Sequence, residues 1–362
     1  METFRKYYLF STLFAIAAVI AGYVIGGLAT AWVVAVLGAL EISLSFDNAI
    51  ANARVLRNWD HAWRQRFLLW GMIIAVFGMR VVFPLGIVSV TTGIAPFYFP
   101  GLFGENGNIL SMSLNQPEVY SGHLTAVHHE VAGFGGAFLF MVAFGFFFEE
   151  RHVHWLEAIE TRLTSLGQIE GVAAAITLII AYIVSKTFGD VGHGTEFFMA
   201  AVWGVITFVI AHGIGSYFGS DDEDDDGAED GVPVGKIIKA GIGGFIYLEI
   251  MDASFSFDGV IGAFVLSNYL PVIALGLAIG AFFVRSMTIH LVETKTLAKF
   301  PFLEHGAFWA ILALASIMFA SGAGHELPNW LVGLISIAFI GAALVHSVIF
   351  TRKEAAAAPA IA

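Results

Sequence analysis

The chain has 362 residues, of which 58% are hydrophobic and only 13% are charged, and it contains no cysteine. A soluble protein would carry about twice that charged share, and the lack of cysteine excludes disulfides and thiolate metal sites. The 17 Lys and Arg residues against 29 Asp and Glu residues exclude a nucleic-acid partner. Several apolar stretches reach the roughly 20 residues that cross a bilayer as a helix. The composition therefore predicts an all-α, polytopic membrane protein whose main partner is the lipid bilayer.

Apolar stretches taken in chain order predict about ten membrane-spanning helices. They cover residues 8–28, 32–53, 67–90, 134–148, 171–185, 197–218, 237–265, 271–289, 307–320 and 331–350. A long loop is expected at residues 91–133 and an amphipathic surface helix at residues 149–168. The first stretch is longer than the apolar core of a signal peptide, so we expect it to be a retained helix.

The helix count divides the chain into two halves of five helices, and an odd number per half predicts inverted repeats. Residues 1–218 would form the first repeat plus the sixth helix, and residues 236–354 the rest of the second repeat. An acidic cytoplasmic linker at 219–235 and a tail at 355–362 complete the chain. Lys and Arg favour the cytoplasmic side. Their distribution predicts cytoplasmic N- and C-termini in a bacterial inner membrane.

Two short stretches inside these helices repeat one pattern of polar residues. The first holds Glu41, Ser43, Ser45, Asp47 and Asn48, and the second holds Asp252, Ser254, Ser256 and Asp258. Aligning Asp47 with Asp258 places a carboxylate, two serines, a phenylalanine and an aspartate at the same offsets. An ionisable group inside a membrane by default marks an ion or proton pathway. Matched copies in the two halves predict one shared site between the repeats.

The chemistry of the two motifs favours a hard cation. The candidate ligands are Glu41, Asp47, Asn48, Asp252 and Asp258, with the hydroxyls of Ser43, Ser45, Ser254 and Ser256 in support. A set made only of oxygens suits Mg²⁺, Ca²⁺ and Mn²⁺ rather than Zn²⁺ or copper. The alternative is a structural polar cluster that holds helices together.

Geometry sets a condition on this site. On a regular helix Glu41 and Asp47 diverge by about 120°, so both reach one ion only if the helix is broken. Gly38 and Gly259 are positions where a break costs little. Arg80 and Arg285 lie at similar distances beyond the two motifs. They could neutralise the carboxylates of an empty site, or pair with them only for packing.

The stretch at residues 41–49, with Leu-Ser-x-Asp-Asn-Ala, resembles the first signature of the TerC superfamily of membrane proteins, most closely its long branch. The contexts of Arg80 and Arg285 resemble buried arginines of that family, and the resemblance covers residues 4–350. The second motif departs from the TerC form, because Gly259 and Val260 follow Asp258 where Pro-Ala is expected. The resemblance implies inverted repeats with acidic ligands at their interface, and a role in Mn²⁺ export or in resistance to metal or tellurite stress.

These observations lead to one principal function and two alternatives. We expect a secondary transporter that exports a divalent cation, which the resemblance to the TerC superfamily implies to be Mn²⁺, without a resident cofactor and without enzymatic activity. The sequence has no phosphate-binding loop for ATP hydrolysis. The first alternative is a non-transporting membrane subunit or metal sensor in a stress-resistance complex. An intramembrane enzyme with paired carboxylates has the least support, and a homo-oligomer is left open.

Two further features have competing interpretations. The acidic run at residues 221–226 is either a charged linker or an electrostatic trap for cations, and we favour the linker. His128, His129 and Glu130 end the predicted loop before the fourth helix. They either cap that helix at the interface, which we favour, or bind a metal ion there.

Overall fold

The computed structural model describes residues 2–100, 107–151, 153–191, 193–217 and 240–357, and these residues form helices and no strands. The prediction of an all-α architecture is confirmed. The predicted linker at 219–235 and the acidic run within it lie outside the described residues, as does most of the predicted tail.

The first half of the chain contains these elements: α1 (Glu2–Tyr7), α2 (Leu9–Leu44), α3 (Phe46–Leu56), α4 (His61–Arg66), η1 (Phe67–Gly71), η2 (Ile74–Val82), α5 (Phe83–Thr92), α6 (Ile109–Asn115), α7 (Pro117–Ala126), α8 (His128–Phe147), α9 (Glu157–Gly167), α10 (Val172–Ser185) and η3 (Lys186–Val191). The second half contains α11 (His193–Tyr217), α12 (Ile242–Ala263), α13 (Leu270–Glu293), α14 (Thr296–Lys299), α15 (Leu303–Gly322) and α16 (Asn329–Ala357).

Seven described helical segments are long and apolar enough to cross a membrane, and the bent α9–α10 pair would make eight. The polytopic architecture is therefore confirmed. The count of eight is two lower than the predicted ten, and each difference has its own reason. Helix α2 holds two predicted helices, because the chain reverses at Gly26 and Gly27, the latter with a φ of 74° that glycine tolerates. The predicted seventh helix, α12, is not among the seven because it carries three carboxylic residues, Glu249, Asp252 and Asp258.

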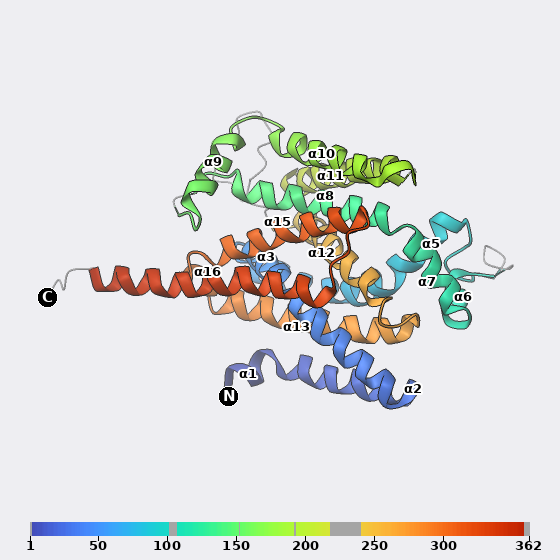
Figure 1. Cartoon of the computed structure of the whole chain (residues 1–362). Helices are drawn as coiled ribbons and strands as arrows, with labels where there is room; N and C mark the ends of the chain where they lie inside the picture. The colour runs from blue at the N-terminus through green and yellow to red at the C-terminus, as the bar shows by residue number, and fades with distance from the viewer. Residues whose placement is uncertain (1, 101–106, 152, 192, 218–239, 358–362) are drawn as a thin grey trace.

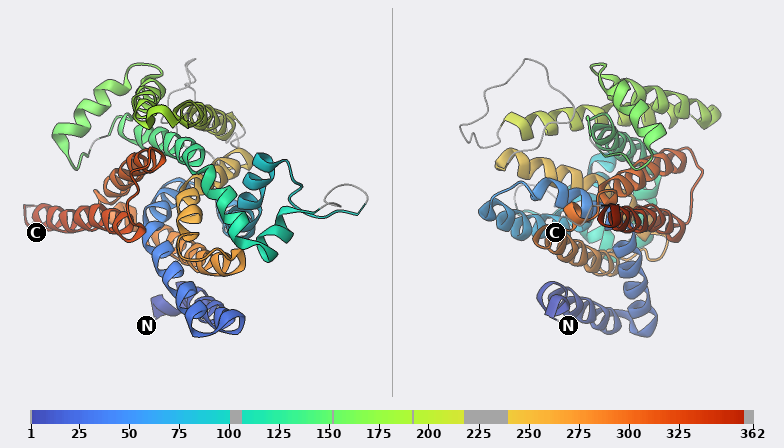
Figure 2. Two further views of the ribbon diagram at one scale, coloured as in Figure 1. Left: turned by 45° about the vertical axis from the view of Figure 1, so that its right-hand side comes forward. Right: turned by 90° about the vertical axis from the view of Figure 1, so that its left-hand side faces the viewer.

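Both ends of the described chain lie at one end of the helix bundle. In Figure 1, α1 and the C-terminal end of α16 are both on the left, and the turn between the two legs of α2 is on the right. The first leg of α2 and the α9–α11 group form opposite edges of the bundle in every view (Figures 1 and 2). This arrangement agrees with termini on the same side, whereas the side of the membrane and the inverted repeats stay predictions.

Two details of the predicted third and fourth helices are corrected. The segment at 91–133 is not a continuous loop, because it holds α6, α7 and the start of α8. Asn108 caps α6 by accepting a hydrogen bond from the backbone N–H of Ser111 (2.9 Å), and Pro117 begins α7. The third helix includes the two π-helical stretches η1 and η2, which often mark functional positions.

Helix α8 packs closely against α11 and α15 through glycine. A Cβ atom built on Gly204 would lie 2.3 Å from the carbonyl oxygen of Phe134, and one on Gly136 would lie 2.6 Å from the Phe319 ring. Small residues allow such close approach of membrane helices. At the end of the bundle that holds the termini, Arg54 and Arg151 both bind Glu149 (2.7 and 2.5 Å), which ties α3 to the segment after α8.

Candidate functional site

A small polar cavity of about 30 Å³ lies between α3, α12, α13 and the η1–η2 segment. We call it the central cavity. Its polar lining consists of Ser45, Asn48, Asn52, Arg80, Asp252, Ser256, Arg285 and Thr288. This volume suffices for a water-sized occupant or two. The cavity thus brings together Ser45 and Asn48 of the first motif, Asp252 and Ser256 of the second, and both predicted arginines.

Asp252 connects the two motifs directly. Its Oδ1 atom accepts hydrogen bonds from the side-chain amides of Asn48 (2.6 Å) and Asn52 (3.0 Å). The two asparagines are four residues apart on α3, so they share a face of that helix. Their own Oδ1 atoms are buried and have no hydrogen-bond partner among the described residues. The cavity thus contains oxygen acceptors that lack a donor, which is costly unless a cation or water binds them.

Glu41 and Arg80 form a buried ion pair beside the cavity, with 2.7 Å between Oε1 and a terminal guanidinium nitrogen. Arg80 also donates to the carbonyl oxygens of Leu277 (2.9 Å) and Ala75 (2.6 Å). Glu41 fits because glycines face it: a Cβ on Gly280 would lie 2.0 Å from its Cγ. Glu41 is therefore already neutralised and hydrogen-bonded.

The predicted helix break exists, but it lies at Ser45 rather than at Gly38 or Gly259. Helix α2 ends at Leu44 and α3 begins at Phe46, with Ser45 at φ −101° and ψ 15°. Gly38 instead packs against Ile279. The Gly259 position leaves space for the carboxylate of Glu41, since a Cβ there would lie 2.7 Å from Oε2. This contact explains why the second motif has glycine directly after Asp258.

Asp47 is placed by the same break. It lies in the first turn of α3 and is fully buried, and its Oδ1 accepts the backbone N–H of Asn48 (2.9 Å). A carboxylate at a helix N-terminus is stabilised by the helix dipole. Its Oδ2 atom has no described hydrogen-bond partner. The structure therefore places Asp47 beside Asn48, at the start of the helix that supplies the cavity's amides.

Two of the predicted supporting serines do not line the central cavity. Ser43 lies outside the cavity and donates to the backbone oxygens of Ala39 and Leu40. Ser254 is buried and donates to the Ile250 oxygen of its own helix, and it does not line the cavity either. Both serines face away because residues two apart in a helix point about 200° apart, so Ser43 and Ser254 lie opposite Ser45 and Ser256. The backbone of Asp258 belongs to α12, but its side chain lies outside the described part of the structure.

Sequence reasoning missed Asn52 and Glu249. Glu249 lies three residues before Asp252 on α12, and its Oε1 atom is buried without a described partner. It approaches Gly71, a residue of the cavity lining, where a Cβ would lie 2.5 Å from that oxygen. Two signals could have identified them. Asn52 follows Asn48 by one helical turn, and Glu249 is a further carboxylate inside an apolar helix.

The charges around the cavity leave a negative excess among the described side chains. Four carboxyl groups, Glu41, Asp47, Glu249 and Asp252, stand against the guanidinium groups of Arg80 and Arg285. The Nε atom of Arg285 is buried and has no hydrogen-bond partner in the described part of the chain. If all six groups are ionised, their formal charge of about −2 equals the charge that one divalent cation balances.

Fold and site define a polytopic membrane protein with an ionisable site inside its helix bundle. The chain belongs to the DUF475 family, described as a protein of unknown function, whose model matches residues 46–354. The chain is also similar to the uncharacterized membrane protein YceF of Bacillus subtilis (strain 168), with 31% identity over 109 residues. That match covers 30% of this chain and 42% of YceF, so it spans less than half of the relative. No solved structure matches the chain. The resemblance to the TerC superfamily is not part of these findings and stays a prediction.

Proposed function

We propose that this protein is a membrane transporter that exports a divalent cation, with Mn²⁺ the cargo that its ligands favour. The observation that carries the proposal is the central cavity, whose polar lining comes from both sequence motifs and includes Asn48 and Asn52, whose buried amide oxygens have no donor among the described residues. The resemblance of the first motif to the TerC superfamily supports the same cargo. The proposal assigns the chain no resident cofactor and no enzymatic activity.

The ligands follow from the contacts described above. Asp252 would bind the cation with one carboxylate oxygen. Asn48 and Asn52, whose amide nitrogens donate to Asp252 in this structure, would turn their amide oxygens toward the cation. Ser45 and Ser256 line the same cavity and offer hydroxyl oxygens. Hard cations such as Mg²⁺, Ca²⁺ and Mn²⁺ take such ligands, and an anionic oxygen offsets part of the lost hydration. When no cation is bound, the guanidinium group of Arg285 would neutralise part of the carboxylate charge that Arg80 leaves unpaired.

Transport also requires that the cavity open to each side in turn, and two irregular segments border it. The break at Ser45 lets α3 tilt against α2. Residues 67–82, which include η1 and η2, supply Phe67, Gly71 and Arg80 to the lining. Hinges of moving helices are commonly a few residues at the ends of elements. We assign the gating motion to these two places. We infer the direction of export, outward from the cytoplasm, from the predicted cytoplasmic position of the basic loops.

The test is flux into proteoliposomes that contain the purified full-length protein and a fluorescent Mn²⁺ indicator. Asp252→Asn should lower the Mn²⁺ flux at least about 100-fold, because the neutral amide keeps the shape but not the charge. The control is Ser43→Ala, which changes the first motif outside the cavity and should transport like the wild type. Wild-type flux in Asp252→Asn, at equal reconstitution, would refute the proposed site.

A second function is favoured by the hydrogen bonds that Asp252 already accepts. Asn48 and Asn52 already donate to Asp252, so the polar group is partly closed without a cation. A non-transporting subunit or metal sensor of a stress-resistance complex could use such a group. Equilibrium binding of ⁵⁴Mn²⁺ that is lost in Asp252→Asn, together with no flux by the wild type, would favour this function over transport.

A further inference from the structure

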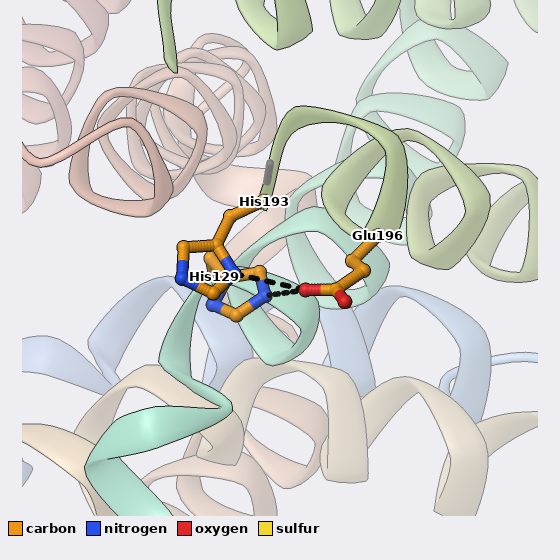
Figure 3. A group of neighbouring side chains, drawn as sticks. All are labelled: His129, His193 and Glu196. Carbon is orange, nitrogen blue, oxygen red and sulfur yellow. Dashed lines mark hydrogen bonds and ion pairs between the residues drawn. The ribbon is translucent and has the colours of Figure 1, made fainter. Parts of the chain in front are cut away.

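Three potential metal ligands meet at the end of the bundle opposite the chain termini. His129 lies in the first turn of α8, and His193 and Glu196 lie in the first turn of α11 (Figure 3). We call them the His–Glu cluster. Their ligand atoms all lie within 4.8 Å of one another. The sequence left a metal role open for His129, and His193 lies 64 residues further along the chain.

The side chains of the cluster are already oriented toward a common point. Oε2 of Glu196 is 3.0 Å from Nε2 of His129 and 2.9 Å from Nδ1 of His193. Figure 3 shows both rings facing the same carboxylate oxygen. In a tetrahedral zinc site with bonds of roughly 2.0–2.1 Å, neighbouring ligand atoms are about 3.3 Å apart. A metal ion could therefore enter with shifts of a few tenths of an ångström at these contacts.

The donor types define which ions would bind. Two imidazole nitrogens and one carboxylate oxygen suit Zn²⁺ and other first-row transition ions, whereas Ca²⁺ and Mg²⁺ prefer oxygens alone. Glu130 follows His129 directly, and its Oε1 atom lies 3.9 Å from Nε2 of His129, close enough to supply a fourth ligand. His193, Glu196 and Glu130 are exposed or half-buried, so an ion can reach the cluster from solvent.

We propose that His129, His193 and Glu196 form a second metal site, which binds a divalent transition-metal ion of the Zn²⁺ class and joins the N-terminal ends of α8 and α11. The site is independent of the proposed transport function, since it shares no residue with the central cavity. Its ligand set also differs from the oxygen-only set of that cavity. The alternative is a hydrogen-bonded polar cluster without metal.

The experiment measures Zn²⁺ binding to the full-length protein, purified in detergent with a tag that contains no histidine. Competition with a chromophoric chelator gives the affinity, and Co²⁺ gives the visible absorption of a tetrahedral nitrogen and oxygen site. We expect one Zn²⁺ per chain. His193→Ala and Glu196→Gln should each weaken binding at least about tenfold. Glu196→Gln can still accept the hydrogen bonds from both histidines, so its loss of binding would separate a metal site from a polar cluster.

Two variants control the experiment. His325→Ala removes an exposed histidine from the loop after α15, and Asp252→Asn alters the central cavity; both should bind Zn²⁺ like the wild type. Thermal unfolding in detergent should shift upward with Zn²⁺ in the wild type and in these controls, but not in Glu196→Gln. Wild-type affinity in Glu196→Gln, equal loss in His325→Ala, or no bound Zn²⁺ at all would overturn the proposal.

Discussion

The two sequence motifs carry the same pattern of polar residues. The structure nevertheless uses the first carboxylate of each motif, and the arginine that follows each motif, in different ways. Glu41 aligns with Asp252, and Arg80 corresponds to Arg285. In the first pair the carboxylate and the guanidinium bind each other at 2.7 Å. In the second pair Asp252 instead accepts amide hydrogen bonds from α3, and the buried Nε of Arg285 has no described partner. We call Glu41 and Arg80 the closed half-site, and Asp252 and Arg285 the open half-site.

The local backbone accounts for part of this difference. Arg80 lies in the π-helical stretch η2, and its guanidinium reaches back to the Ala75 oxygen, whereas Arg285 lies in the regular helix α13. Glycines at 259 and 280 leave room for the longer Glu41 side chain. Glu41 and Arg80 have thus become a packed ion pair. Asp252 and Arg285 instead line a cavity that also contains unsatisfied polar groups, which is the arrangement that a ligand site requires.

Breaking the closed half-site should give the largest effect on stability. Glu41→Gln leaves Arg80 as a buried charge without its carboxylate, which costs about 3–5 kcal/mol of folding free energy. Arg285→Met removes a guanidinium from the open half-site and should cost less than about 1 kcal/mol, because no described ion pair is lost. Thermal unfolding in detergent, followed by size-exclusion chromatography, measures both variants side by side.

A double variant separates charge from shape in this test. Glu41→Gln combined with Arg80→Met removes both charges and should recover most of the lost stability. If Arg285→Met proved as unstable as Glu41→Gln, the contrast between the half-sites would be wrong. Arg285 would then be paired, and Asp258 would be the carboxylate to test next.

Sequence alone predicted the membrane helices and the meeting of the two motifs. Apolar length identifies spans because every backbone group must be bonded within a helix. Repetition of Ser45, Asp47 and their partners predicted a shared site between two repeats, since ionisable groups at membrane depth are rare, and that site stays a prediction. The helices at 171–185 and 331–350 were predicted within a few residues of α10 and α16, apart from the longer C-terminal end of α16.

The rest depended on contacts that no pattern reveals. The break falls at Ser45, although glycines at 38 and 259 looked cheaper, because packing against Ile279 and Glu41 occupies those glycines. Ser43 and Ser254 match the repeat but turn to their own helix backbones. The His–Glu cluster joins a residue of α8 to two residues of α11. Because His129 is far from His193 and Glu196 in the sequence, no short motif could identify the cluster.

A smaller effect should follow from filling the space that the closed half-site needs. Gly280→Ala would place a Cβ 2.0 Å from Cγ of Glu41, so the ion pair must shift. Overpacking of this kind costs about 1–3 kcal/mol. Gly86→Ala is the matched control, since a Cβ on this helical glycine meets nothing within 4 Å. We expect a lower unfolding temperature only for Gly280→Ala; equal temperatures would show that Glu41 can repack freely.

The smallest predicted effect concerns the two serines of the second motif, which make the same hydrogen bond within α12. Ser254 and Ser256 each donate to the carbonyl oxygen four residues earlier, at 3.0 Å, but only Ser256 lines the central cavity. Replacing either serine by alanine removes the same local hydrogen bond, so any difference between the variants reports the cavity. If the Ser256 hydroxyl helps to bind the cation, its loss should weaken Mn²⁺ affinity by about threefold to tenfold, the size of one hydrogen-bond-like contact. Equilibrium binding of ⁵⁴Mn²⁺ to both purified variants measures this. Equal affinities would remove Ser256 from the ligand set and leave Asp252, Ser45 and the asparagines of α3 as the ligands.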